Sequence, residues 1–556
     1  MLKKISGGHL AAKYMKEVEQ LGIVFTLSGQ HIENLLDGFT EYNIRTIDVR
    51  HEQAAAMMAH AWSVYNNVPG VCLVTAGPGF TNSLTGIANA YLENVPLVVL
   101  CGRHPLRDDL KGALQEMNQI DMVKPITKWN ATCYDIRRIP EYLSIAFRQA
   151  TMGRPGPVFL ELLPDILFAE VEQNLVDMPL RRKHKTSTQP ETSELEEAAR
   201  IINSAKKPLF LGGSGVGISD CGEALGKFVE KTGVPFVLIN YGRGTLPDNH
   251  SLSLADGGFT GIMAGLPMTD VIIAAGVRFN WVLQSGQLFP NAKVIRIDID
   301  PHEVDRNRPA DIGLVGDMKD VLQRLLPQVE ERDHGEWINT FRNAYTAFMT
   351  TELEKRKTPS DPIHPSRLVD QIMAVFGEDA YYVVDGGDTG YYGLSGFASV
   401  HRAGVLIPSG GLLGCLGTGI PFAMTAKLTH PDKPVIVLNG DGSFGFNGME
   451  FDTAVRHNIP IICVINNDCA WGMIKHSQEI SLGDDRCTCA ELGLRHYEKM
   501  VEGLGGYGEL VTKDEEIIPA LKRAMDSGKP ACINVLTDPK VTSPATILFY
   551  QGFAEL

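Results

Sequence analysis

The stretch "LNGDGSFGFNGMEFDTAVRHNIPIICVINND" (Leu438–Asp468) decides the fold class of this chain. It contains two apolar runs, of which the first ends in "GDGS" and the second in a doubled asparagine, Asn466–Asn467. Runs that are apolar throughout are typical of parallel strands buried on both faces, and such sheets carry functional loops at the carboxyl ends of their strands. The stretch therefore predicts a strand, a tight turn into a helix, and a second parallel strand.

The same pattern recurs along the chain. Apolar runs rich in Val, Ile and Leu alternate with amphipathic segments of helical length, and each run ends in glycine, aspartate or asparagine. The runs are "GVCLVTAGPG", "VPLVVLCG", "KPLFLGGSG", "VIIAAG", "AKVIRIDID", "DAYYVVDGGD", "KPVIVLNGDG" and "PIICVINND". This repetition predicts an α/β protein built from three doubly wound parallel-sheet domains.

Length and two polar stretches set the expected domain boundaries. A chain of 556 residues is too long for one core, since a domain usually spans about 100–200 residues. The polar stretches Arg181–Glu194 and Glu352–Ser366 carry charge and turn formers without strand periodicity, as interdomain linkers do. We therefore expect domains at residues 1–180, 195–335 and 365–556.

Composition excludes several classes of partner. Hydrophobic residues make up 44% of the chain, and the formal net charge of −15 disfavours nucleic acid and anionic membranes, because both attract basic surfaces. The ten cysteines form no CxxC pair, and no apolar segment reaches the roughly 20 residues of a membrane-spanning helix. The amino-terminal residues alternate charged with apolar positions, unlike a signal peptide. We expect a reduced, cytoplasmic protein that acts on small molecules.

Oxygen ligands follow the two strands of the opening stretch. Asp441 stands where a strand gives way to a helix, and glycine-flanked backbone N–H groups at such a junction bind phosphate oxygens. A carboxylate there would repel phosphate unless a cation lay between them. Asp441, the side-chain oxygen of Asn467 and the carbonyl of Cys469 are the hard oxygen ligands that Mg²⁺ prefers. The pattern predicts a metal–diphosphate site, whereas a lone "GDG" would only predict a turn.

The spacing of "GDGS" and the doubled asparagine resembles the motif of the thiamin diphosphate (ThDP)-dependent enzymes. The resemblance covers essentially the whole chain and implies a pyrimidine-binding, a middle and a diphosphate-binding domain in that order. It also implies that Mg²⁺ is bound by Asp441, Asn467 and Cys469. The remaining contacts to the diphosphate end of the cofactor would come from Gly440, Gly442, Ser443, Trp471, Gly472 and Met473.

The first domain supplies the other half of the implied site. In "IDVRHEQAAAMMAHAWS", Glu52 follows a predicted strand and opens an apolar helix, where it is either a helix-capping residue or the family's activating glutamate. The resemblance implies that Glu52 hydrogen-bonds the pyrimidine ring, and that Gly414 and Leu416 bend the cofactor into its V shape. It also implies a homodimer at minimum, and a homotetramer by preference, since two subunits build each site in the family.

The residues that would face the substrate resemble those of benzaldehyde lyase. His31 and Gln115 match the residues that handle the hydroxyl proton of an acyloin there, and His476 in "AWGMIKHSQE" is a further candidate. A histidine near its ordinary pKa can move such a proton. The implied function is a carbon–carbon lyase or carboligase acting on acyloins, aldehydes or 2-hydroxyacyl compounds through an enamine intermediate.

Three alternatives stay open. The acetolactate synthase group shows the same domain pattern, but it has a tryptophan where this chain has Ser477. The middle domain resembles that of oxalyl-CoA decarboxylase and 2-hydroxyacyl-CoA lyase, and a nucleotide such as FAD or ADP, or none, would occupy it. Its candidate contacts are Gly213, Gly215, Arg278, Asp298 and Asp300. The third alternative is a cofactor-binding paralogue without activity, which the presence of Glu52 disfavours.

Overall fold

The computed structural model describes residues 3–180, 188–254, 264–483, 486–547 and 550. The chain divides into two compact units. The first unit consists of residues 1–186, 411–429 and 447–457, and the second of residues 187–410, 430–446 and 458–556. Each unit is described by itself below.

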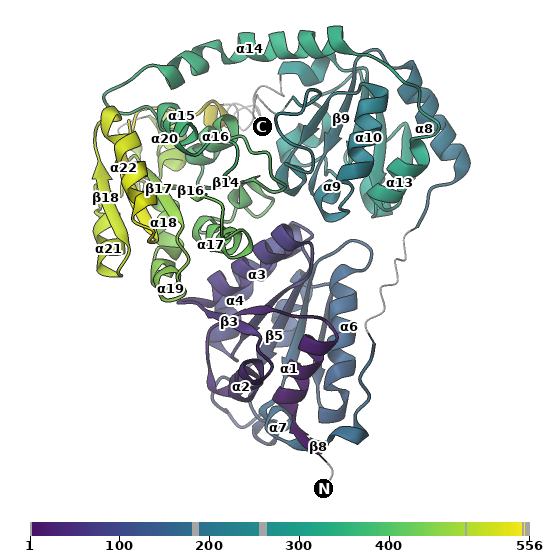
Figure 1. Cartoon of the computed structure of the whole chain (residues 1–556), viewed down its shortest axis with the longest axis vertical. Coiled ribbons are helices and arrows are strands. Elements are labelled where there is room, and N and C mark those ends of the chain that lie inside the picture. The colour runs from purple at the N-terminus through teal and green to yellow at the C-terminus, as the bar shows by residue number, and fades with distance from the viewer. Residues whose placement is uncertain (1–2, 181–187, 255–263, 484–485, 548–549, 551–556) are drawn as a thin grey trace. The chain divides into compact units, whose positions relative to one another are not determined.

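The first unit is built on a six-stranded parallel sheet with the order β3-β2-β4-β5-β7-β6 (Figure 1). Its strands are β2 (Ile23–Thr26), β3 (Arg45–Asp48), β4 (Gly70–Val74), β5 (Leu97–Gly102), β6 (Trp129–Cys133) and β7 (Pro157–Leu162). Its helices are α1 (Gly7–Glu17), α2 (Glu33–Glu41), α3 (Glu52–Asn66), α4 (Pro78–Leu92), α5 (Gln119–Val123), α6 (Ile139–Thr151) and α7 (Pro164–Leu167). A short antiparallel pair, β1 (Lys4–Ser6) and β8 (Glu170–Glu172), completes this part.

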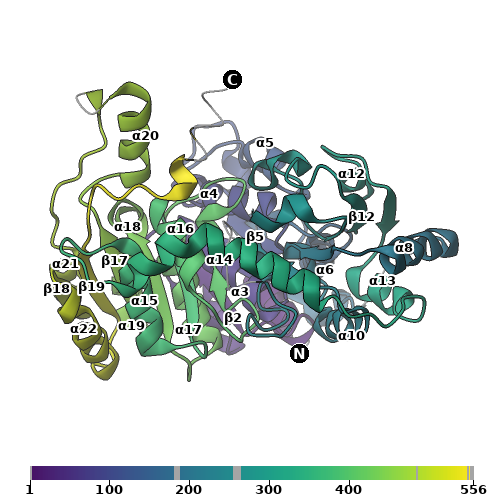
Figure 2. The ribbon, with the colours of Figure 1, turned by 90° about the horizontal axis from the view of Figure 1, so that it is seen from above.

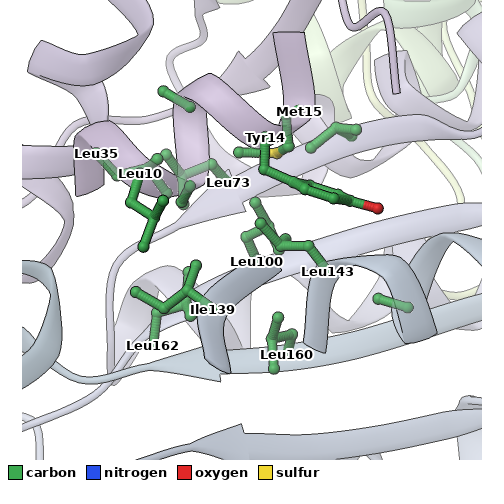
Figure 3. Packing of buried hydrophobic residues seen from close by; sticks show 14 of the residues in the cluster. Leu10, Tyr14, Met15, Leu35, Leu73, Leu100, Ile139, Leu143, Leu160 and Leu162 are labelled. Atoms are coloured by element: carbon green, nitrogen blue, oxygen red, sulfur yellow. The ribbon is translucent and has the colours of Figure 1, made fainter. Parts of the chain in front are cut away.

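One face of this sheet is covered by α1, α2 and α6 (Figure 3). Tyr14 and Met15 of α1 and Leu143 of α6 point into the same apolar layer as Leu100 and Leu160 of the strands (Figure 3). Burying one such side chain contributes about 1.5–3 kcal/mol. The hydroxyl of Tyr14 donates to Glu19 at 2.9 Å, so its polar end stays satisfied.

The middle sheet belongs to the second unit and has five parallel strands in the order β10-β9-β11-β12-β13. They are β9 (Pro208–Gly212), β10 (Phe236–Leu238), β11 (Val271–Ala275), β12 (Lys293–Asp298) and β13 (Ile312–Val315). The helices of this region are α8 (Thr192–Ser204), α9 (Ser214–Ile218), α10 (Gly222–Thr232), α12 (Pro301–Val304) and α13 (Met318–Leu325). Apolar clusters cover both faces of the sheet, as expected for strands that are apolar throughout.

The third sheet has six parallel strands in the order β15-β14-β16-β17-β19-β18. They are β14 (Tyr381–Asp385), β15 (Val405–Leu406), β16 (Val435–Gly440), β17 (Ile462–Asn467), β18 (Tyr507–Val511) and β19 (Ala531–Leu536). The accompanying helices are α15 (Pro365–Phe376), α16 (Asp388–Gly396), α17 (Gly419–Thr429), α18 (Asp441–Asn447), α19 (Glu450–Arg456), α20 (Gly472–Leu482), α21 (Tyr497–Gly503) and α22 (Asp514–Asp526). Of these, α17 and α19 belong to the first unit.

The first and third sheets are wound in the same order. If β2 is taken as the first strand of one sheet and β14 as the first strand of the other, the two sheets have the same strand order. In both, the chain reverses its winding direction beside this first strand. Ligands of open parallel sheets bind at such switch points, outside the carboxyl ends of the strands. The two switch points lie between β2 and β4 and between β14 and β16.

The predicted fold class is confirmed, and each of the eight apolar runs forms a strand. The linker predicted at Glu352–Ser366 is wrong over its first half, because α14 (Gly335–Lys357) continues through it and leads to α15 (Figures 1 and 2). Its "ELEKRK" end consists of strong helix formers, with basic residues in the last turn where the helix dipole favours them. In the other predicted linker, residues 181–187 lie outside the described residues, and α8 begins at Thr192.

None of the helices in the described part of the chain combines the length and the apolar character needed to cross a membrane.

Candidate active site

The switch point of the first sheet brings together two of the three residues predicted to face the substrate, His31 and Gln115. The turn after β4 runs from Thr75 to Gly77, where α4 begins. Gly77 has φ +64°, in the left-handed region that glycine adopts without strain. His31, which follows β2, and Gln115 both contact this turn.

His31 is buried and its ring is fixed. Its Nδ1 lies 3.0 Å from Oγ1 of Thr75. With the proton on Nδ1 the ring donates to that hydroxyl, and Nε2 keeps a lone pair. Burial, and then the neighbouring His104, lower the pKa of His31 below its usual range, so the ring is neutral at neutral pH.

Gln115 lies against Gly77 of the same turn. A Cβ on Gly77 would approach Cβ of Gln115 to 2.7 Å, so the side chain packs directly on the glycine. Gln115 itself has φ +62°, and its buried Oε1 has no hydrogen-bond partner among the described residues. A buried amide oxygen of this kind is unusual in a finished core and suits a group that meets a ligand.

Glu52 is the first residue of α3 and is buried. Its Oε2 accepts a hydrogen bond from Nδ2 of Asn82 at 3.0 Å. Glu450 holds the start of the same helix, because its carboxylate accepts the backbone N–H groups of Arg50 and His51 at 3.0–3.1 Å. Sequence reasoning missed Asn82 and Glu450, since an asparagine within a helix and a glutamate at a helix start carry no distinctive pattern.

Gly414 and Leu416 lie in the segment of the first unit that precedes α17. Gly414 is exposed with φ +63°, and Leu416 is half-buried. The segment is held at one end by Glu93, whose carboxylate accepts the Leu412 N–H at 3.0 Å, and at the other by Asn447, which donates to the Gly417 carbonyl at 2.6 Å. The loop around Gly414 is thus supported on both sides.

In the second unit, Asp441 and Asn467 stand at the third sheet's switch-point edge. The register pairs Gly440 with Asn466, so Asp441 and Asn467 follow at adjacent positions of neighbouring strands. Asp441 is buried, its Oδ1 accepts the Gly442 N–H at 2.9 Å, and no backbone, amide or hydroxyl donor among the described residues reaches its Oδ2. Burial, and then the adjacent carboxyl of Asp468, raise the pKa of Asp441 well above its usual range.

This pair of carboxyls fits a divalent cation. A buried carboxyl with one oxygen left without an N–H or hydroxyl donor, close to a second carboxyl, is costly in its charged form unless a positive charge balances it. The side-chain oxygen of Asn467, which accepts the Cys469 N–H at 2.9 Å, is a further hard ligand at this edge. Sequence reasoning missed Asp468, because its importance comes from lying beside Asp441 in the folded chain, and the motif itself does not show this.

The carbonyl of Cys469 is engaged in this conformation. Cys469 has φ +62°, and its carbonyl accepts the N–H groups of Leu492 and Gly493, each at 2.8 Å. It therefore does not point freely to a metal, in contrast to Asp441. To bind the metal as predicted, the Cys469 carbonyl would have to give up one of these hydrogen bonds.

The neighbouring predicted contacts pack closely around Asp441. The ring of Trp471 lies on Gly442, where a Cβ would approach it to 2.5 Å, and Gly472 lies against the carboxylate of Asp468. Met473 packs on Gly387, at the end of β14, in the same way. A Cβ at any of these three positions would clash, so glycine allows Trp471, Asp468 and Met473 to pack directly on the backbone.

Ser443 is already bonded within the turn. Its hydroxyl lies 2.9 Å from the Asp385 carbonyl and 3.0 Å from that of Gly440, and it accepts from Nδ2 of Asn439 at 3.3 Å. These contacts fix the junction between β16 and α18.

His476 is buried, with both ring nitrogens occupied. Nδ1 lies 2.7 Å from Oδ2 of Asp388, and Nε2 lies 3.0 Å from the Pro539 carbonyl. Burial lowers the pKa of His476, but the bonds to Asp388 and Pro539 outweigh it and raise the pKa above its usual range. The other Asp388 oxygen accepts from the Ser543 hydroxyl at 2.6 Å. In this arrangement His476 ties α16, α20 and the carboxyl-terminal segment together and has no nitrogen left to exchange a proton.

The glycines of the middle domain serve its own packing. The N–H of Gly213 donates to the Ala275 carbonyl at 2.9 Å, and that of Gly215 donates to the Gly276 carbonyl at 3.1 Å. A Cβ at Gly215 would lie 2.7 Å from Cα of Gly276. These N–H groups are thus not open to a diphosphate.

The acidic residues of this domain also have local partners. Asp298 accepts the Asp300 N–H at 3.0 Å, and burial raises the pKa of Asp298 to about 6. Asp300 caps α12 by accepting the His302 N–H at 3.0 Å, and Arg278 is half-buried in the segment after β11. Local hydrogen bonds thus engage Asp298 and Asp300 in this structure.

Three protein-family models match the three sheet-containing regions of the chain, in the order in which they occur. The models for the thiamine pyrophosphate enzyme N-terminal TPP-binding, central and C-terminal TPP-binding domains match residues 5–122, 195–325 and 388–535. The acetolactate synthase large subunit IlvG of Mycobacterium tuberculosis is 35% identical over 546 residues, which cover 97% of this chain and 96% of that protein.

A second group of relatives carries a different activity in its name. The 2-hydroxyacyl-CoA lyase of Arabidopsis thaliana is 30% identical over 558 residues, covering 96% of both chains. Human 2-hydroxyacyl-CoA lyase 1 is 28% identical over 569 residues, covering 98% of this chain and 96% of that protein. Since these similarities extend over nearly the whole sequence, this chain belongs to the thiamine pyrophosphate enzyme family.

Proposed function

We propose that this ThDP-dependent enzyme is a lyase or carboligase that breaks or forms the bond next to a carbinol in acyloins, aldehydes or 2-hydroxyacyl compounds. The observation that carries the proposal is the buried ring of His31, fixed by Thr75 in the same turn that Gln115 contacts at the switch point of the first sheet. A neutral imidazole can accept the hydroxyl proton of a carbinol near pH 7. In these residues the site is most like that of benzaldehyde lyase.

The cofactor and its metal would be held by the second unit. Asp441 and Asn467 would bind Mg²⁺, with Cys469 as a third ligand, and the glycine-lined surface at Gly442 and Gly472 would receive the diphosphate. When bound, ThDP would supply a carbon nucleophile to this site. Gly414 and Leu416 would contact its rings.

The chain's own residues would move the protons. Glu52, fixed by Asn82, would hold the proton that activates the cofactor's pyrimidine ring. In the cleavage direction Nε2 of His31 would take the proton from the substrate hydroxyl as the carbon–carbon bond breaks and an aldehyde leaves. The amide of Gln115 would orient that hydroxyl, and His476 would act only by holding α20 in place.

A second candidate is decarboxylation of a 2-oxo acid followed by ligation, as the name of the acetolactate synthase relatives suggests. The 35% identity over nearly the whole chain supports it. Ser477 weighs against it, because this side chain is small and buried and its hydroxyl donates to the Ile474 carbonyl at 2.8 Å. Cleavage of a 2-hydroxyacyl-CoA is the third candidate, after the relatives of that name.

The proposed roles of the domains follow from the same assignment of cofactor-binding residues. Residues 1–180 would bind the pyrimidine and residues 365–556 the diphosphate, while residues 195–335 would form a middle domain without a nucleotide. The assembly would be a homodimer at minimum and a homotetramer by preference. All ten cysteines are thiols in the structure, which agrees with a reduced, cytoplasmic location.

The deciding experiment measures carbon dioxide release from a panel of 2-oxo acids, pyruvate included, with ThDP and Mg²⁺ supplied. In parallel, benzoin and smaller acyloins are offered and aldehyde release is measured. Aldehyde release without carbon dioxide supports the lyase proposal. Rapid carbon dioxide release with a coupled acyloin product would replace it with the acetolactate synthase-type reaction.

A further inference from the structure

A buried amide lies beneath the two side chains proposed to face the substrate. Gln119, the first residue of α5, is 1% exposed, and all four hydrogen-bonding positions of its side chain are used. Oε1 accepts the Gly77 N–H at 3.1 Å and the Cys101 thiol at 3.8 Å. Nε2 donates to the Gly102 carbonyl at 3.0 Å and to Oε1 of Glu161 at 2.9 Å.

The two glycines held by this amide are the ones that His31 and Gln115 touch. A Cβ on Gly77 would lie 2.7 Å from Cβ of Gln115, and a Cβ on Gly102 would lie 2.6 Å from Cβ of His31. One side chain thus joins the backbone behind His31 to the backbone behind Gln115. Moving either glycine moves the side chain packed on it.

Glu161 decides which way the amide faces. It is 2% exposed, its Oε2 accepts the Thr132 hydroxyl at 2.5 Å, and the Arg103 guanidinium lies 3.8 Å from the same oxygen. A carboxylate only accepts hydrogen bonds, so the nitrogen of the Gln119 amide must face it and the oxygen must face Gly77. The pair is therefore locked in one orientation.

We propose that Gln119 is a positioning residue that fixes the spacing between His31 and Gln115, with Glu161 as the group that orients it. The inference deepens the proposed function, because it assumes that these two side chains share the handling of the carbinol proton. A merely structural Gln119 would affect folding and every step alike, whereas a positioning residue affects the proton transfer alone.

A double-mutant cycle tests the proposal on the full-length enzyme with ThDP and Mg²⁺. Gln119→Leu should lower kcat for acyloin cleavage by about 100-fold, as displacement of a reacting group by about 1 Å does. Affinity for ThDP and exchange of the C2 proton of the cofactor, which depend on Asp441 and Glu52, should not change. In the double variant Gln119→Leu/Gln115→Ala, the loss in kcat should be clearly smaller than the product of the two single losses, because coupled residues are not additive.

Gln371→Leu is the matched control. Gln371 of α15 is 3% exposed and donates to the Asp514 carbonyl at 3.4 Å, so the variant should lower Tm without changing kcat. The proposal is overturned if the losses from Gln119→Leu and Gln115→Ala add in full, or if Gln119→Leu slows C2 exchange as much as cleavage. Should Gln119→Leu not fold, Glu161→Gln replaces it, with an expected loss in kcat of about tenfold and an unchanged KM.

A readout without turnover separates this inference from the proposed function. If the wild-type enzyme exchanges the C2 proton but cleaves no acyloin, the proposed function fails. The positioning role is then judged from the NMR titration of His31. Loosening of Gly102 in Gln119→Leu should admit water and move the pKa of His31 upward, toward its ordinary range, and an unchanged titration would reject the role.

Discussion

Nδ2 of Asn82 donates a hydrogen bond to Oε2 of Glu52 at 3.0 Å, while the other oxygen of this carboxylate faces the start of α4 at Gly79. An amide from α4 thus fixes a carboxylate at the start of α3. The carboxylate cannot rotate freely, although it sits at a helix terminus. Proton transfer needs such a fixed geometry, because efficiency depends on distance and alignment in the transition state.

Glu52→Gln should keep ThDP bound and lower turnover by about 100-fold or more, because the variant cannot hold the activating proton. Calorimetric titration with ThDP and measurement of kcat check the two halves of this expectation. Asn82→Ala should have a smaller effect on C2 exchange, since the carboxylate remains. Near-normal turnover of Glu52→Gln would contradict the assigned role.

Asp441→Ala should lose Mg²⁺ and, with it, tight binding of ThDP. The buried Oδ2 of Asp441 has no donor among the described residues, so the cation is its expected partner. Electron paramagnetic resonance of bound Mn²⁺ measures the loss independently of activity. Asp370→Ala, which removes a carboxylate that only pairs with Arg367 on α15, serves as the control. Unchanged Mn²⁺ affinity in Asp441→Ala would refute the site.

The pH profile of kcat/KM should have an acid limb set by His31. As a base the ring must be neutral, so the rate is present above its pKa and is lost as the pH falls through it. Burial and His104 lower this pKa, which places the midpoint below the ordinary value of about 6.5. The His31→Gln variant should lack the limb, and a limb that persists there would assign it to another group.

The same shift predicts a direction for stability. Protonation of a buried, neutral imidazole favours the unfolded chain, which binds the proton more readily. The contribution of His31 to the free energy of unfolding should be complete above about pH 6.5 and should be lost as the pH falls below it. Thermal melts of wild type and His31→Gln between neutral and mildly acidic pH should therefore converge at the acid end.

Purified enzyme should carry no flavin. The N–H groups of Gly213 and Gly215 donate hydrogen bonds to carbonyls at the end of β11, and this leaves them unavailable to a diphosphate. An absorbance spectrum of the purified protein, followed by chromatography of the denatured supernatant, checks this for FAD and ADP together. A stoichiometric nucleotide would show that this part of the chain rearranges on binding.

The sequence predicts the parts of the site that rest on local patterns. Asp441 and Glu52 each follow a strand and open a helix, and the structure has both junctions at the expected residues. The eight quoted strands were readable because their runs are mostly apolar, although β12 carries Arg296 in its middle. The helical part of the predicted linker at Glu352–Ser366 could not be recognised in the same way, since a solvent-exposed helix and a linker can have the same charged composition.

Contacts that depend on tertiary packing were out of reach. Gln119 meets Glu161 because α5 comes to lie at the end of β7, and neither residue belongs to a recognisable spacing. His476 was a further candidate for proton transfer because its segment resembles that of benzaldehyde lyase, yet the ion pair with Asp388 only exists once α16 and α20 are packed. Residue type indicates what a side chain can do, and its partners decide whether it remains available.

The turn at Gly77 limits how this enzyme can diversify. A side chain there is excluded twice, by the φ of +64° and by Gln115 at 2.7 Å from its Cβ. Substitutions at Gly77 should therefore be strained and poorly tolerated. The segment that leads to it offers more freedom, because Leu110 and Leu114 are 93% and 74% exposed. Natural drift and laboratory selection for new substrates should both accumulate changes in that segment and leave the glycine unchanged.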